Sequence, residues 1–314
     1  MRKEIIFLSV CVFFSLHASA QFTKYIVRFA DKAGTPFSIG DPSKFLSERA
    51  IERRAKQHIS IDETDLPIVP AYIDSIRSVK NVTVLDGSKW LNQICIATTD
   101  SLAIVKINSF PFVVKTSPVK RLIRSNLAGR NQSPELLQKS KLNEEIRGIS
   151  SPASPPVAGN YYSYGNSYAQ VHIHNGEYLH NKGFRGEGML IAIIDAGFYH
   201  YRSLPAFDSV NINTKVIDTY DFVENEPSVD EDNYHGMMCF SVIAANTPGK
   251  LIGSCPNANF ILYRSEDVAS ESPVEMQYWI AAAERADSAG ADVISTSLGY
   301  NTFDNPAFDF SYAD

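Results

Sequence analysis

The stretch that most constrains the fold of this chain is residues 186–197, which read Gly-Glu-Gly-Met-Leu-Ile-Ala-Ile-Ile-Asp-Ala-Gly. Its apolar run, Met189 to Ile194, is short, rich in β-branched residues and bounded by glycines, which is typical of a strand buried on both faces of a parallel sheet. One acid, Asp195, follows the run directly. Because open α/β sheets place their sites at the carboxyl ends of their strands, we expect Asp195 to lie in a functional site.

A second segment further along the chain begins Tyr-His-Gly and continues with an apolar helical pattern to Ala245. A histidine followed by glycine at this point places His235 at the start of a helix and not in its middle. Cys239 follows four residues later, so its side chain shares a face of that helix with His235.

Four segments in this order resemble the subtilisin-like serine protease family. They are Asp195–Phe198 after the buried strand, His235-Gly236 at the helix start, the loop Gly253–Ala258 (Gly-Ser-Cys-Pro-Asn-Ala), and Ser297-Leu298-Gly299 after the strand that begins at Asp292. The resemblance covers Tyr161–Tyr300. It implies that Asp195 orients the imidazole, that His235 is the general base, and that Ser297, Leu298 and Gly299 bind the substrate.

The sequence also departs from the family pattern. Ala196 stands where Ser or Thr is usual, and Met237-Met238 stand where Thr-His is usual. The family's nucleophile pattern, Gly-Thr-Ser-x-Ala/Ser-x-Pro, and its oxyanion-hole asparagine segment have no match, and Ser297 ends a strand instead of opening a helix. We therefore expect the chain to carry only the N-terminal half of a catalytic domain, truncated before the serine, and by itself to be inactive and either poorly soluble or partly unfolded.

The first twenty residues have the features of a secretory signal peptide. Arg2 and Lys3 precede an apolar stretch from Ile5 to Leu16, and Ala18-Ser19-Ala20 forms a small-residue cleavage site. No later run is long and apolar enough to span a bilayer. We expect residues 1–20 to be removed and the product to be secreted or periplasmic, which fits a hydrolase and equally fits a binding protein.

Residues 21–124 show an α+β pattern. We expect strands at 25–29, 82–85, 93–97 and 112–116, and helices beginning at Asp41-Pro42, near Tyr72 and at Asp100-Ser101. This order, with one extra helix, resembles the ferredoxin-like propeptide that subtilisin-like proteases use as inhibitor and folding chaperone. The resemblance implies that the chain's own propeptide is a partner of its catalytic domain.

Charge separates the two regions. Residues 21–124 hold 16 Lys and Arg against 10 Asp and Glu, whereas residues 159–314 hold 7 against 21. Net charges of about +6 and −14 favour a docked pair and fast encounter, although two independently solvated surfaces would give the same count. Residues 125–158, rich in Pro and Ser near their end, read as a linker in which maturation cleavage takes place.

The remaining catalytic region, residues 159–314, alternates strands with helices. Strands are expected at Asn259–Arg264 and Asp292–Ser297, and a helix from the capping box Ser272-Pro273-Val274-Glu275 to Gly290. This alternation predicts a parallel, helix-covered α/β sheet of the subtilisin-like type.

Other motifs receive structural interpretations. The pair His172 and His174, and likewise His180 and His200, are read as structural residues and not as metal ligands. The family often contains calcium sites, but the spacing of the acids in Asp218–Asp232 matches no calcium loop, so we interpret them as a solvated acidic face and assign no metal or other cofactor. The Gly186-x-Gly188 pair precedes its strand, which excludes a dinucleotide-binding loop.

Three cysteines follow the signal peptide: Cys95, Cys239 and Cys255. A Cys239–Cys255 disulfide and two free, buried thiols are both compatible with the sequence, and we favour free thiols. Function is interpreted as that of a secreted serine endopeptidase precursor that hydrolyses proteins and peptides, with no nucleic-acid partner. The alternatives are an inactive remnant and a propeptide-type inhibitor or binding protein of another protease.

Overall fold

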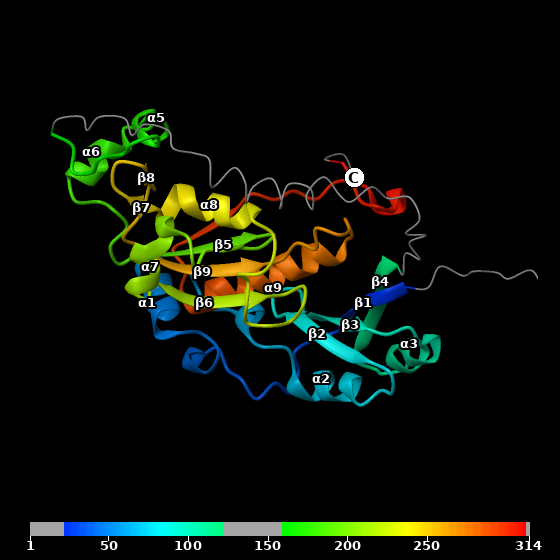
Figure 1. Ribbon diagram of the computed structural model, residues 1–314. Coiled ribbons are helices and arrows are strands. Elements are labelled where there is room, and N and C mark those ends of the chain that lie inside the picture. The colour runs from blue at the N-terminus through cyan, green and yellow to red at the C-terminus, as the bar shows by residue number, and fades with distance from the viewer. Residues whose placement is uncertain (1–21, 122–158, 312–314) are drawn as a thin grey trace, which may run out of the picture.

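The computed structural model describes residues 22–121 and 159–311. The expected signal peptide, linker and maturation site lie outside these residues. None of the described helices combines the length and the hydropathy that crossing a membrane requires. Two units, one antiparallel and one parallel, pack on opposite sides of a shared helix (Figure 1).

The N-terminal unit is a four-stranded antiparallel sheet in the order β2-β3-β1-β4. Its strands and helices, in chain order, are β1 (Phe22–Phe29), α1 (Glu48–Gln57), α2 (Pro70–Arg77), β2 (Thr83–Ser88), β3 (Gln93–Ala97), α3 (Ser101–Asn108) and β4 (Val113–Arg121). This is the expected ferredoxin-like arrangement with one additional helix. Asp100 caps α3 as predicted, its carboxylate accepting from the Leu102 N–H at 2.9 Å.

Alternation along the strands divides the side chains of this sheet between two cores. Val27, Ile94 and Ile96 point to one face, where they pack with Ile76 of α2 and Ile107 of α3. Their neighbours Ile26 and Cys95 point to the other face, toward the second unit. Because successive side chains of a strand lie on opposite faces, a single sheet serves both cores.

The predicted helix start at Asp41-Pro42 is wrong. Pro42–Lys44 form only a short 3-10 turn, and Asp41 makes no side-chain cap. The α-helix begins at Glu48, where the Ser47 hydroxyl accepts from the Ala50 N–H at 3.0 Å. The serine cap supplies the orphan N–H group with a partner, and this fixes the start six residues later than proline alone suggests.

The second unit is built on a four-stranded parallel sheet in the order β10-β5-β9-β6. Its strands are β5 (Leu190–Asp195), β6 (Val216–Asp221), β9 (Asn259–Arg264) and β10 (Val293–Thr296). Every residue of β5 is buried, as expected for a strand covered on both faces. This confirms the predicted fold class, an α/β sheet preceded by an α+β unit.

Helices cover both faces of the parallel sheet (Figure 1). On one face α8 (His235–Ala244) packs its Phe240 against Phe207 and Phe260. On the other face lies α9 (Val274–Ala289), and the smaller elements are α5 (Tyr168–His172), α6 (Gly176–Asn181), α7 (Asp208–Ile212), β7 (Asn246–Thr247) and β8 (Leu251–Ile252). The sequence analysis does not predict β6.

Helix α9 is the element that joins the two units. Its fully buried Tyr278 and Ala282 belong to one core that also contains Ile261 of the parallel sheet and Cys95 of the antiparallel sheet. Helix α9 therefore lies between two sheets, and burying both of its faces stabilises the docked arrangement.

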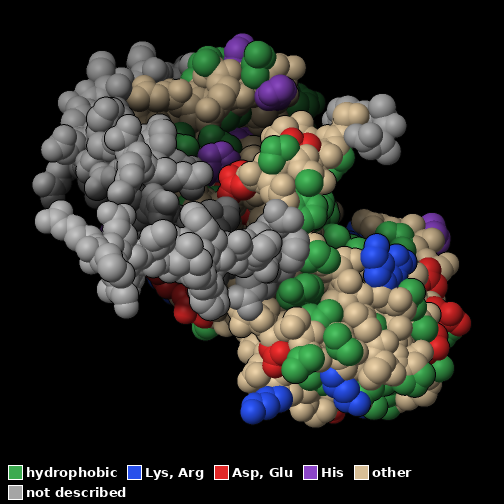
Figure 2. Space-filling model, turned by 90° about the vertical axis from the view of Figure 1, so that its right-hand side faces the viewer, with side chains coloured by type: hydrophobic (Ala, Val, Ile, Leu, Met, Phe, Trp, Pro, Cys, Tyr) green, Lys and Arg blue, Asp and Glu red, His purple; other side chains and the backbone are tan. Residues whose placement is uncertain are grey.

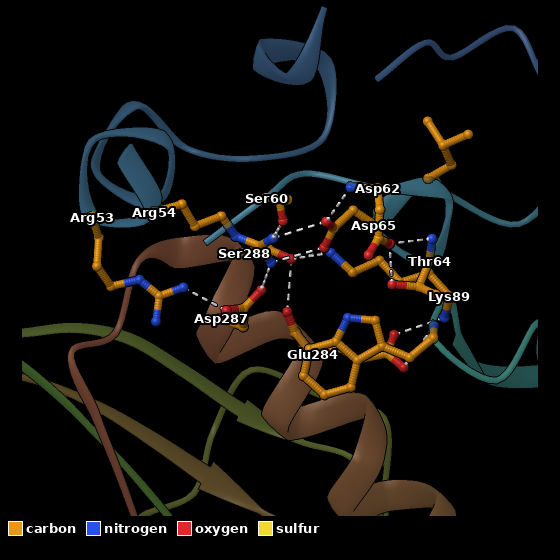
Figure 3. A network of polar contacts seen from close by, with 12 residues as sticks. Arg53, Arg54, Ser60, Asp62, Thr64, Asp65, Lys89, Glu284, Asp287 and Ser288 are labelled. Carbon is orange, nitrogen blue, oxygen red and sulfur yellow. Dashed lines mark hydrogen bonds and ion pairs between the residues drawn. The ribbon is translucent and has the colours of Figure 1, made fainter. Parts of the chain in front are cut away.

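Ion pairs at this interface follow the charge difference that the sequence shows. Arg53 and Arg54 of α1 both bind Asp287 of α9, and Arg54 also binds Asp65 at 2.8 Å (Figure 3). In the same figure the Glu284 carboxylate accepts from the backbone N–H of Lys89 at 2.7 Å. On the outer face in Figure 2, charged side chains of both signs are scattered over the lower part of the molecule. Basic side chains of the N-terminal unit thus pair with acidic side chains of α9 in specific, partly desolvated contacts.

Candidate active site

Asp195 ends β5 at the carboxyl edge of the parallel sheet. Its side chain is fully buried, and Oδ1 accepts from the Ala196 N–H at 2.7 Å. The same oxygen lies 2.6 Å from Nδ1 of His235. A buried charge is tolerated only when it is paired and hydrogen-bonded, and His235 supplies that pairing.

His235 is the first residue of α8, as the sequence predicts. The helix start is fixed by Asn233, whose Oδ1 accepts from the His235 N–H at 2.7 Å. The imidazole is 43% exposed, so one edge meets the carboxylate while the ring remains accessible. Since Nδ1 faces Asp195, Nε2 is the nitrogen left for proton transfer.

Two glycines allow the strand end and the helix start to meet. A Cβ on Gly236 would lie 2.5 Å from the Gly197 carbonyl oxygen and 2.8 Å from Asp195 Cβ. Gly197 adopts φ +138°, and a Cβ there would lie 2.6 Å from the Asn233 N. The Asp-Ala-Gly and His-Gly motifs therefore have a steric reason: a side chain at either glycine would separate the carboxylate from the imidazole.

Cys239 lies beneath the imidazole, one helical turn after it. Its Sγ is 4.0 Å from His235 Nδ1, and the Ser297 hydroxyl lies beside the thiol. Burial raises the pKa of Cys239, and the Ser297 hydroxyl opposes that rise. Cys95, Cys239 and Cys255 are all free thiols, with Cys239 and Cys255 half-buried instead of fully buried.

A metal ion would find one set of ligands among the residues that the structure describes. One ligand atom from each of Asp195, His235 and Cys239 lies within 4.8 Å of the others. Carboxylate, imidazole and thiolate suit a zinc-like ion. The same atoms form the Asp–His contact, so an ion held there would compete with that contact.

A pocket of about 310 Å³ opens beside the imidazole. His235, Asn233 and Ala196 form one side of it, and Leu298 lines it as well. Of the three predicted substrate-binding residues, Leu298 thus lies at this pocket, Ser297 lies beside Cys239, and Gly299 has open space around its Cα.

Acids from the loop between β9 and α9 and from the start of α9 form much of the remaining wall. Glu266, Asp267 and Glu271 lie in the loop, and Glu275 lies in the first turn of α9. Glu275 is buried, and its two carboxylate oxygens accept from the N–H groups of Asp267 at 3.0 Å and Ser272 at 2.8 Å. Burial raises the pKa of Glu275 to about 8. The sequence analysis does not identify this acidic wall.

The capping box predicted at Ser272 forms only in part. The Glu275 carboxylate binds the Ser272 N–H, but the buried Ser272 hydroxyl makes no hydrogen bond within the described residues. The backbone N–H of Glu275 instead donates to the Ser272 carbonyl oxygen at 3.0 Å, and the Glu275 carboxylate also accepts from the Asp267 N–H.

The acidic stretch 218–232 is tied to arginines. Arg264 binds Asp221 at 2.6 Å and Asp232 at 2.8 Å, and Arg285 binds Asp218 at 2.9 Å. Burial raises the pKa of Asp232 to about 6 despite that pairing. Asp221 is fully buried, so a wholly solvated acidic face is not what forms here.

The four other histidines named above take the following places. His180 is buried, with Nδ1 2.8 Å from the Tyr164 hydroxyl and Nε2 2.9 Å from the Ser254 carbonyl oxygen. His172 stacks on Tyr168 and pairs with Glu177. His174 is an exposed residue, and His200 contacts the Ser203 hydroxyl at 3.3 Å.

Together, the fold and the site define an α/β protein with a buried carboxylate–imidazole pair at the carboxyl edge of a parallel sheet, covered on one side by an antiparallel N-terminal unit. Two family models match this chain: the peptidase S8 propeptide domain of Bacteroidota at residues 24–135, and the subtilase family at residues 186–312. Residues 186–312 thus match the subtilase family, and the N-terminal unit matches a propeptide domain of the same peptidase family.

Two curated proteins are similar to this chain in sequence. The minor extracellular protease Vpr of Bacillus subtilis is 34% identical over 134 residues, which are 40% of this chain and 15% of that protein. Thermitase of Thermoactinomyces vulgaris is 31% identical over 119 residues, 36% of this chain and 38% of that protein. The matches thus span well under half the length of either relative.

Among solved structures, fervidolysin from Fervidobacterium pennivorans, a keratinolytic enzyme, aligns at TM-score 0.46 and 15% identity, covering 88% of this chain and 36% of that chain. The epidermin leader peptide processing serine protease of Staphylococcus aureus aligns at TM-score 0.48 and 15% identity, covering 88% and 50%.

Proposed function

We propose that this chain is part of the precursor of a secreted serine endopeptidase, in which Asp195 and His235 act as the carboxylate–base pair. The observation that carries the proposal is the 2.6 Å contact between Asp195 Oδ1 and His235 Nδ1 in a subtilase sheet. The signal-peptide features of residues 1–20 and the extracellular relative Vpr support export.

The proposed chemistry follows from which nitrogen each group meets. Asp195 accepts a hydrogen bond from Nδ1–H, which stays protonated, so the lone pair of Nε2 is available to take the proton of a serine nucleophile. When His235 becomes positively charged, the buried carboxylate stabilises the imidazolium. The proposed nucleophile is a serine of the Gly-Thr-Ser type, and residues 1–314 contain no such pattern.

Substrate peptides are proposed to lie along Ser297, Leu298 and Gly299. Leu298 shares a pocket with His235, and this supports a substrate path past the imidazole. The N-terminal unit is proposed to act as the inhibitory propeptide, which its extensive contact with α9 supports.

The test is proteolysis by the protein expressed from its own gene. Casein hydrolysis should be abolished by a serine-directed reagent, and His235→Ala should lose most activity. His172→Ala, which alters an exposed histidine, is the matched control and should retain it. Near-normal hydrolysis by His235→Ala would remove His235 from the mechanism.

A further inference from the structure

The acidic pocket beside His235 has no lysine or arginine among the described residues that line it. Its acids are not equivalent. Glu275 is engaged by two backbone N–H groups, and Glu266 accepts from the hydroxyls of Tyr300 and Ser265. These two carboxylates are buried, and their hydrogen bonds within the chain hold the loop in place.

Asp267 differs because it already binds a cation from another part of the chain. Its Oδ2 lies 2.5 Å from Nζ of Lys120, the penultimate residue of β4. Its Oδ1 accepts from the Ala269 N–H at 3.2 Å, which orients the carboxylate. The side chains of Asp267 and Lys120 are 19% and 21% exposed, so the pair is partly desolvated and stronger than an open surface pair.

Charge on Asp267 is favoured by these contacts. Burial alone would raise its pKa, but the hydrogen bond and charge of Lys120, with the Ala269 and Ser270 contacts, outweigh burial and lower the pKa. Lys120 thus favours the charged form of the Asp267 carboxylate in the precursor. Once the N-terminal unit leaves, this carboxylate would lose its lysine, and Asp267 is one of the residues that line the pocket beside His235.

We propose that Asp267 determines specificity by binding a lysine or arginine side chain of the peptide substrate close to the scissile bond, in the place that Lys120 occupies in the precursor. The inference rests on the proposed function, which makes the pocket beside His235 a substrate pocket. A single carboxylate positioned on a backbone-anchored loop gives selectivity because an uncharged side chain leaves it unpaired.

The test is peptide binding to the full chain, a measurement that needs no hydrolysis. Lys120→Ala vacates the carboxylate, and affinity is then measured by fluorescence anisotropy for an acetylated Ala/Ser heptapeptide with an uncharged fluorophore and a central lysine. The matched peptide carries norleucine, which has the same length without the charge. We expect the lysine peptide to bind at least about 10-fold more tightly in low salt.

Adding Asp267→Asn to the Lys120→Ala chain should bring this ratio close to one. Asparagine keeps the oxygen that caps Ala269, and because the readout is a ratio between two peptides, a general loosening of the loop would weaken both peptides alike. Asp74→Asn, an exposed carboxylate on α2, is the charge-matched control and should leave the ratio unchanged.

Equal binding of the two peptides by the Lys120→Ala chain would overturn the inference, as would a lysine preference that survives Asp267→Asn. Either result would leave the proposed protease function standing, because that function is tested by hydrolysis. Conversely, an inactive protein with a lysine-selective pocket would refute only the catalytic proposal.

Discussion

At the scale of single residues, the site depends on backbone that approaches too closely for side chains. Gly236 lies between Asp195 and the Gly197 carbonyl, and the 2.6 Å contact of carboxylate and imidazole exists only because no Cβ intervenes. This makes glycine a positioning residue of the site, although it contributes no chemistry of its own.

Gly236→Ala should therefore destabilise the chain by about 2–3 kcal/mol, because the new methyl group must displace the Gly197 carbonyl and the Asp195 side chain. Gly299→Ala is the control: its Cβ would meet nothing within 4 Å, and its effect should stay within about 0.5 kcal/mol. Urea denaturation of both variants measures the difference. If the two substitutions cost the same, the close approach at Gly236 does not hold the site together.

Asp195 and His235 were open to prediction because each sits in a local motif whose strand or helix context is visible in the sequence. Asn233 and Asp267 were not, since their roles depend on residues brought near by folding. The Ser272 capping box was predicted from the local sequence, but its Glu275 also binds the Asp267 N–H, a contact that the local sequence does not show.

At the scale of elements, the strands with strong apolar patterns were the predictable ones. β3 and β9 have the bounds that the sequence indicates, Gln93–Ala97 and Asn259–Arg264. β6 was missed because two of its six residues are acids, and their partners, Arg264 and Arg285, come from other elements. From the local sequence, burying such acids looks unfavourable. The arginines that offset this unfavourable free energy are distant in the sequence.

Strand β2 carries a pH-sensitive acid, Asp86, at the interface with α9. Its Oδ1 accepts from Gln277 of α9 at 2.6 Å, whereas Oδ2 is buried without a hydrogen-bond partner within the described residues. Burial raises its pKa to about 6, opposed by Gln277 and Lys24 and assisted by Glu284. The folded chain thus holds this proton more tightly than the unfolded chain does.

The stability contributed by protonated Asp86 is fully present below about pH 4 and is lost as pH rises through 6. Asp86→Asn should remove this loss. The difference in free energy of unfolding between the variant and the unmodified chain should therefore favour the variant more at pH 8 than at pH 4.5, by on the order of 1–3 kcal/mol. Urea denaturation at the two pH values tests this. Parallel pH profiles for the two proteins would show that Asp86 does not titrate in this range.

At the scale of the whole molecule, two units of opposite charge share α9. The sequence predicted the division and the sign of each charge, and the structure adds which groups meet: Arg53 and Arg54 with Asp287, and Lys120 with Asp267. The exact domain boundaries, 1–20, 21–124, 125–158 and 159–314, remain predictions.

Isolated residues 21–124 should inhibit the mature protease at micromolar concentration, and more weakly as salt rises. Screening by salt acts on the pairs at the interface rim, while the apolar contacts around Tyr278 persist. Inhibition constants at 20 mM and 500 mM NaCl (roughly 20 Å and 4 Å Debye lengths) check this. Salt-independent inhibition would mean that the charge difference plays no part in docking.

The role of Asp195 in holding His235 as a general base can be measured through the kcat of the Asp195→Asn variant. The asparagine keeps the size of the side chain but presents the wrong partner to Nδ1, so kcat should fall roughly 10³–10⁴-fold with little change in KM. Asp208→Asn, at an exposed carboxylate, should behave as the unmodified protein does. We expect that loss for Asp195→Asn alone, whereas a kcat within a few-fold of that of the unmodified protease would show that Asp195 does not hold the base.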